Sequence, residues 1–190
     1  MKSHSNPFAS RCMESIPYQF TDISLHTVME QLASQNFRGS ITGPKGSGKT
    51  TLLETIGRQL GQTGFSCDYL YFKKDSKLRC RQQLKPVTGE DISKTAYLID
   101  GTEQLSRFEW SRLYSKIKLS GAVVLTAHVK SPLPPLIHTQ TSPSLLYDLV
   151  LKLNGKTDMI SEQAVFDLYH RHKGDIRQAL RELYDVWAER

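Results

Sequence analysis

Residues 43–50 of this chain read GPKGSGKT, in which four residues separate the first glycine from a Gly-Lys-Thr triplet. The short run RGSIT precedes this segment and TLLETIGRQL follows it, which predicts a strand, a tight loop and a helix in that order. Glycine permits backbone conformations that other residues avoid, so successive N–H groups of the loop can point toward one anion. Unpaired N–H groups at the start of the following helix add to this positive environment. The segment therefore predicts a loop that binds a chain of phosphates.

The spacing of the loop also predicts a role for each of its polar side chains. Lys49 is expected to reach the β- and γ-phosphates, and the Thr50 hydroxyl is expected to bind Mg²⁺. The expected cofactors are therefore ATP and Mg²⁺, with ADP as the other nucleotide state. The nucleotide-binding residues expected from this pattern are Gly43, Pro44, Lys45, Gly46, Ser47, Gly48, Lys49, Thr50 and Thr51.

The composition is that of a globular chain with one sizeable core, or one domain plus a small appendage. Hydrophobic residues make up 38% and charged residues 23% of the 190 positions, which is outside the range of disordered chains. No apolar run approaches the ~20 residues that span a bilayer, and the first twenty residues lack the apolar stretch of a secretion signal. The three cysteines form no CxxC pair, which favours a reducing compartment. We expect a cytoplasmic protein without a membrane contact.

The net charge of +6 is concentrated in residues 73–85, KKDSKLRCRQQLK, which carry six Lys or Arg residues and one acid. Such a segment can meet nucleic acid or an acidic protein partner. No aromatic residues that would stack on bases are interleaved with the charges, so a solvated basic surface is the alternative.

Strand and helix patterns alternate along the first three quarters of the chain, which predicts a parallel sheet covered on both sides. The run TAYLIDG at 95–101 is apolar throughout its centre, as expected of a strand buried on both faces. The other expected strands are 39–43, 66–72, 121–128 and a short one at 136–139, and the expected helices are about 23–34, 51–60 and 104–118.

After about residue 143 the strand patterns stop, and three helical segments follow. The last has an apolar stripe at helical spacing, and Asp175 is a suitable N-cap for it. The stripe consists of Ile176, Ala179, Leu180, Leu183 and Trp187. These patterns divide the chain into an irregular N-terminal segment (1–20), an α/β core (21–142) and a helical subdomain (143–190).

Further candidate residues stand at the ends of the expected strands. Asp100 ends an apolar strand, where its carboxylate can hold Mg²⁺, so Thr50 and Asp100 are the expected metal residues. The next acid is Glu103, either the activator of the attacking water or an exposed residue whose charge suits a helix N-terminus. The fourth strand ends in Thr126-Ala127-His128, and Thr126 or His128 is a candidate to sense the γ-phosphate or to position water.

The C-terminal run Gly174-Asp-Ile-Arg-Gln-Ala-Leu180 resembles the sensor-two motif of AAA+ ATPases, especially the clamp-loader and replication-initiator type. Together with the glycine loop, the resemblance covers roughly residues 38–188 and implies an α/β fold, a parallel-sheet P-loop NTPase core with a small C-terminal helical lid. It implies that Arg177 reaches the nucleotide phosphates. That family usually has Asp-Glu where this chain has Asp100-Gly101. The expected catalytic residues are Lys49, Asp100, Glu103, Thr126 and Arg177.

Three functions are consistent with these features. The first is a slow AAA+-like ATPase or nucleotide-gated switch that acts on a macromolecular partner, in which case Arg107 and Arg112 are candidates to face a neighbouring subunit of an oligomer. The second is a small P-loop kinase whose basic run closes over the transferred phosphate, although such lids usually follow the acid-bearing strand and this run precedes it. The third is a module that binds ATP without turnover.

Overall fold

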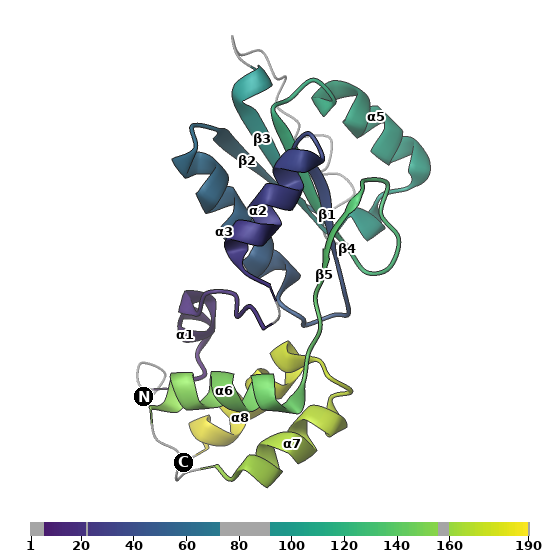
Figure 1. The fold of residues 1–190 in the computed structure, drawn as a ribbon. Coiled ribbons are helices and arrows are strands. Elements are labelled where there is room, and N and C mark those ends of the chain that lie inside the picture. Colours follow the sequence, from purple (N-terminus) through teal and green to yellow (C-terminus); the bar gives the residue numbers. More distant parts are fainter. Residues whose placement is uncertain (1–5, 22, 73–91, 156–159, 190) are drawn as a thin grey trace. The chain divides into compact units, whose positions relative to one another are not determined.

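The computed structural model of the protein describes residues 6–21, 23–72, 92–155 and 160–189 (Figure 1). The chain forms two compact units. The α/β unit comprises Tyr18–Gly43 and Lys49–His138. The helical unit comprises Met1–Pro17, Pro44–Gly48 and Thr139–Arg190. The expected boundary near residue 142 is therefore close to the observed one, but the middle of the glycine loop joins the helical unit.

The α/β unit is built on a five-stranded, all-parallel sheet with the strand order β2-β3-β4-β1-β5. Its central strand β4 is buried along its whole length, which explains why its sequence AVVLTA is apolar rather than alternating. The strands are β1 (Arg38–Thr42), β2 (Ser66–Tyr71), β3 (Thr95–Asp100), β4 (Ala122–Ala127) and β5 (Pro135–His138).

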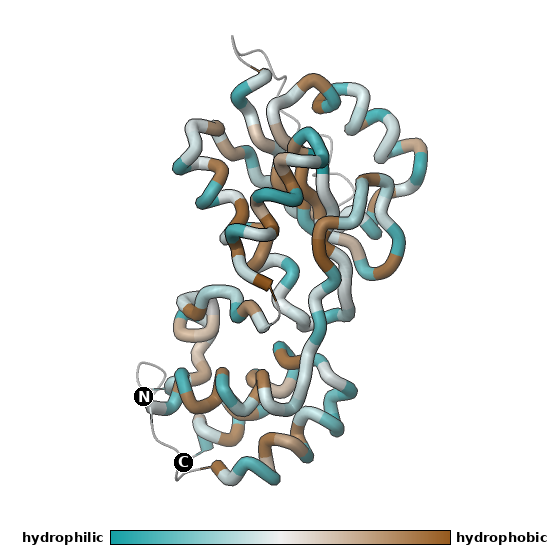
Figure 2. The backbone as a smooth tube through the Cα atoms, in the orientation of Figure 1, coloured by the Kyte–Doolittle hydropathy of each residue, from teal (hydrophilic) through white to brown (hydrophobic). Residues whose placement is uncertain are grey.

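Helices cover both faces of this sheet. Helices α2 (Leu25–Ser34) and α3 (Lys49–Gln62) pack on one face, and α5 (Arg107–Ile117) packs on the other. Figure 2, in which the backbone is coloured by residue hydropathy, shows hydrophobic residues concentrated on the strands between these helices. The expected α/β class is confirmed as a parallel sheet with helices on both sides.

The segment between β3 and α5 differs from its prediction. A helix was expected from about residue 104, but α5 begins at Arg107, after the 3-10 turn η3 (Thr102–Gln104). A capping box sets this start, because the Ser106 side chain accepts from the backbone N–H of Glu109 and the Glu109 carboxylate accepts from that of Ser106. A second 3-10 turn, η2 (Ile92–Lys94), precedes β3.

The helical unit contains the three helices expected after residue 143, α6 (Pro143–Asn154), α7 (Glu162–Arg171) and α8 (Ile176–Ala188). Each begins after a polar N-cap whose side chain accepts a backbone N–H. The buried stripe of α8 is the predicted one, with Trp187 only partly buried. Among the described residues, no helix is both long enough and apolar enough to cross a membrane.

The expectation that residues 1–20 are irregular is wrong for part of that segment. Residues Ser10–Ser15 form the short helix α1, and the Phe8 side chain before it is fully buried among the helices of the helical unit. The Phe8 ring meets that of Trp187 edge-on at 5.9 Å, and Asn6 Nδ2 donates to the Tyr184 carbonyl oxygen at 2.9 Å. One aromatic residue in a polar stretch has no periodicity, so the sequence carries no sign of this packing.

Candidate functional site

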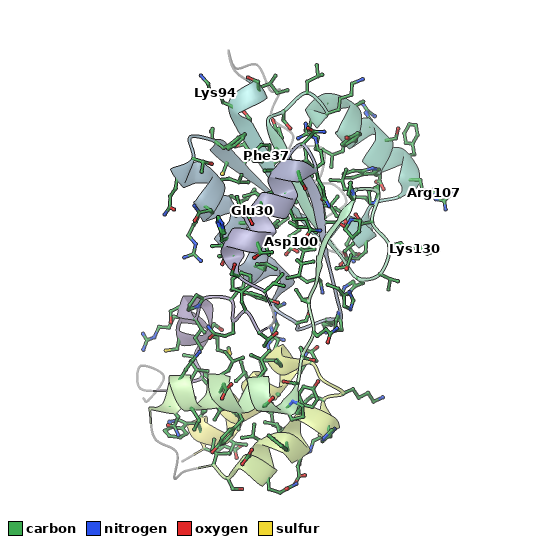
Figure 3. All side chains as sticks on the ribbon, viewed as in Figure 1. Glu30, Phe37, Lys94, Asp100, Arg107 and Lys130 are labelled. Atoms are coloured by element: carbon green, nitrogen blue, oxygen red, sulfur yellow. The ribbon has the colours of Figure 1, made fainter. Side chains whose placement is uncertain are left out.

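The two ends of the glycine loop lie in the α/β unit. Lys49 is the first residue of α3, and its Nζ donates to the carbonyl oxygen of Gly43 at 2.9 Å. Thr50 Oγ1 donates to Asp100 Oδ2 at 2.8 Å. Asp100, labelled in Figure 3, is the last residue of β3. The structure thus brings together the two side chains that the sequence identified as metal residues.

Thr126 completes this cluster from the neighbouring strand. Because β4 lies between β1 and β3, the end of β4 stands between the strand that enters the loop and the strand that carries Asp100. Thr126 Oγ1 donates to Asp100 Oδ1 at 2.5 Å and accepts from the backbone N–H of Gly101 at 3.0 Å. Both oxygens of the Asp100 carboxylate therefore accept from a hydroxyl, which suits its ionised, acceptor-only form.

The residues of this cluster fit Mg²⁺. Magnesium takes oxygen ligands and is usually held by one or two carboxylates together with the phosphates of a substrate. Asp100 supplies one carboxylate, and the Thr50 hydroxyl, which donates its proton to Asp100, keeps lone pairs free for a cation. Within the described part of the chain, no group of three or more His, Cys, Asp or Glu side chains is arranged to hold a metal.

The middle of the loop, Pro44–Gly48, is packed within the helical unit. Ser47 is only 5% exposed, and its Oγ donates to the Pro44 carbonyl oxygen at 2.8 Å. The same Oγ lies 2.6 Å from Thr139 Oγ1. The loop conformation is thus stabilised by a hydroxyl from the helical unit, a contact that no motif in the sequence indicates.

A second contact joins Gly46 to the start of α8. Gly46 has φ +76°, and a Cβ atom built on it would lie 2.1 Å from Asp175 Oδ1. The Asp175 carboxylate also accepts from the backbone N–H of Gln178 and lies 3.7 Å from Lys45 Nζ. The expected N-cap role of Asp175 is confirmed, and the same side chain covers the loop.

Arg177 lies two residues beyond Asp175, in the first turn of α8. Its side chain is exposed while the neighbouring Ile176 is buried, as the apolar stripe predicted. The contact between Asp175 and Gly46 joins the start of α8 to the middle of the loop.

Glu103 lies in η3 and not in the first turn of a long helix. Its Oε1 is 3.1 Å from Nε2 of His128, the residue that follows β4. The sequence identified both residues as candidates but did not link them. The remaining loop residue of the predicted set, Thr51, lies in the first turn of α3, where its carbonyl oxygen accepts from Thr55 Oγ1 at 2.8 Å.

Other residues singled out from the sequence lie apart from this cluster or outside the described residues. Arg107 and Arg112 are exposed on α5, and Figure 3 labels Arg107. Cys67 is a free thiol whose pKa is raised mainly by burial and also by the negative charge of the nearby Asp68. The basic segment 73–85 lies outside the residues that the structure describes.

No protein-family model matches this sequence, and a comparison with curated proteins finds no match. The side chains and their geometry are therefore the basis for assigning a function.

Proposed function

We propose that this protein binds ATP with Mg²⁺ through residues 43–51 and acts as a slow ATPase or nucleotide-gated switch of the AAA+ type. One observation carries the proposal. Three hydroxyl and carboxylate side chains from three different elements, Thr50, Asp100 and Thr126, form one hydrogen-bonded chain directly beyond the glycine loop. In open parallel α/β sheets, ligands bind at this carboxyl edge.

Each side chain has a role that follows from its chemistry. Lys49, at the start of α3, supplies a cation for the β- and γ-phosphates. Thr50 and Asp100 hold Mg²⁺, which when bound neutralises phosphate charge and orients the phosphates. Thr126 fixes the rotamer of Asp100 through its hydroxyl, and Glu103 takes the proton of the attacking water.

The switch part of the proposal is supported by the packing of the loop within the helical unit. A phosphate chain held by the N–H groups of residues 45–48 acts directly on residues that touch this loop, among them Thr139 and Asp175. Asp175 caps α8, so a shift of Gly46 moves the start of that helix. The helical unit then serves as the lid, and Arg177, in the first turn of α8, binds the γ-phosphate. The partner that senses this change is proposed to meet the basic segment 73–85.

Calorimetry with ATP, ADP and GTP in the presence of Mg²⁺ tests nucleotide binding. Lys49→Ala should weaken ATP binding by about tenfold to a hundredfold, as the loss of one charge-assisted contact predicts, while Lys130→Ala on the surface should have no effect. Equal ATP affinity of the parent and Lys49→Ala would refute the loop assignment.

Phosphate release tests turnover. Asp100→Asn should slow release far more than it weakens ATP binding, because Asp100 acts on the metal and the loop backbone does most of the holding. Assays with and without small phosphoryl acceptors and with DNA separate an ATPase from a kinase and from a module without turnover.

A further inference from the structure

The turn after β3 leaves no room for a side chain at position 101. Gly101 has φ +81°, and a Cβ atom built on it would lie 2.3 Å from the carbonyl oxygen of Phe72. Because that oxygen belongs to the backbone, a side chain at position 101 would force the main chain to move. An acidic side chain therefore cannot directly follow Asp100 in this fold.

The chain instead presents its next acid, Glu103, three residues after Asp100 and at a fixed place. The Thr102 hydroxyl donates to the Thr126 carbonyl oxygen at 2.6 Å, which ties η3 to the end of β4. Glu103 Oε1 then lies 3.1 Å from His128 Nε2, within hydrogen-bond distance. Because an ionised carboxylate only accepts, Nε2 carries the proton of this bond. Both side chains keep contact with water, being 29% and 41% exposed.

The strand register places this pair beside the phosphate loop. Thr42 of β1 stands opposite Ala127 of β4 in the parallel pairing. The residues that directly follow these two strand ends are Gly43, which opens the loop, and His128. Lys49 Nζ donates to the Gly43 carbonyl oxygen at 2.9 Å, so the cation expected at the γ-phosphate lies against the residue that follows β1.

We propose that His128 is a positioning residue for Glu103, holding its carboxylate at the edge of the sheet where it takes a proton from the attacking water. The inference rests on the proposed ATP hydrolysis. Water forms a bond to the γ-phosphorus as the bond from that phosphorus to the bridging oxygen breaks. Glu103 receives the proton and returns it to solvent after ADP and phosphate have formed.

The test measures the rate of phosphate release, KM and, separately, the ATP dissociation constant of Glu103 and His128 variants. Glu103→Gln should lower kcat by about a hundredfold or more, the usual loss for a general base, with ATP affinity nearly unchanged. His128→Ala should lower kcat by about tenfold through a misplaced carboxylate, without raising KM. His128→Gln should restore most of that rate, because its amide nitrogen can donate where Nε2 does.

The chain contains a matched control pair on α2. His26 Nε2 lies 3.3 Å from Glu30 Oε1, and both side chains are well exposed; Figure 3 labels Glu30. Glu30→Gln and His26→Ala repeat the same chemical changes and should leave kcat and KM at parent values. Thermal unfolding of all variants excludes a loss of folded protein as the cause of a lower rate.

Four results with the variants overturn the inference. Two of them are a kcat of Glu103→Gln, or of His128→Ala, that equals the kcat of the parent. The others are a His128→Ala effect seen only in KM or in thermal stability, and a failure of His128→Gln to restore the rate. If the parent binds ATP but releases no phosphate, this inference falls and nucleotide binding stands. If the parent does not bind ATP, the proposed function itself falls.

Discussion

Replacing Gly46 with alanine tests the contact between the loop and α8, because the structure makes two separate demands on this position. The backbone has φ +76°, in the left-handed region that residues with a Cβ atom avoid. The new Cβ atom would also lie 2.1 Å from Asp175 Oδ1 and 2.8 Å from its Cγ. Since these distances cannot persist, the Asp175 carboxylate has to leave its position as the N-cap of α8.

The expected cost is the sum of these two effects. The left-handed backbone costs alanine about 1 kcal/mol, and the loss of an N-cap costs about 1 kcal/mol. The ion pair of Asp175 with Lys45 adds little, because the lysine is 67% exposed and the atoms are 3.7 Å apart. Gly46→Ala should therefore lower the unfolding free energy by about 2 kcal/mol. In an Asp175→Ala background, where the cap is already absent, the cost should fall to about 1 kcal/mol.

Urea unfolding, followed by tryptophan fluorescence, measures the unfolding free energy of four proteins. These are the parent, Gly46→Ala, Asp175→Ala and the double variant. The two tryptophans lie in different units, Trp110 in α5 and Trp187 in α8. A Trp110→Phe background therefore leaves a signal from the helical unit alone. Gly155→Ala is the matched control, because Gly155 has φ +63° and, among the residues that the structure describes, no atom outside its chain neighbours lies within 4 Å of its added Cβ atom. It should show the backbone cost of about 1 kcal/mol without coupling to Asp175.

Equal costs of Gly46→Ala in the two backgrounds would refute the reasoning. That result would mean that the Asp175 side chain does not cover Gly46, and it would remove the proposed route from the phosphate loop to α8. A coupling of about 1 kcal/mol, present at Gly46 and absent at Gly155, is the outcome that the geometry requires.

Three further outcomes follow from the helical unit. Arg177→Ala should preserve the fold and lower the preference for ATP over ADP by about tenfold, the effect of losing one charged contact to phosphate. Calorimetry measures the ratio of the ATP and ADP dissociation constants, with Arg181→Ala as the control. An unchanged ratio excludes a contact between Arg177 and the γ-phosphate. Phe8→Ala should lower the unfolding free energy by about 3–5 kcal/mol, because the side chain is fully buried, and a urea titration that shows no loss would contradict this packing. The pKa of Glu182 in the folded state lies below its ordinary value of 4.5, mainly because His172 donates a hydrogen bond to its carboxylate. The stabilisation from this pair is therefore present above that pH and is lost as the pH falls below it; thermal melts at decreasing pH should show the loss in the parent and less of it in Glu182→Gln.

The sequence predicted most elements of the fold, because their signals are local. The apolar run of β3, the helical stripe of α8 and the glycine spacing of the loop each depend on residues within a few positions of one another. The same holds for Asp175 as an N-cap, which accepts from the N–H of Gln178. The predicted helix from about residue 104 begins too early, although the signal for the start of α5 at Arg107 is local, since Ser106 and Glu109 form a capping box.

The contacts that complete the candidate site join segments far apart in the chain. Thr126 orients Asp100 from the neighbouring strand, His128 meets Glu103, and Asp175 covers Gly46. The residue types were visible in the sequence as a strand end, a polar turn and a helix cap, but spacing and periodicity report only on neighbours along the chain. The partners were decided by the order of strands in the sheet and by the packing of the loop within the helical unit. These depend on burial summed over the whole chain, and that sum exists only once the chain has folded.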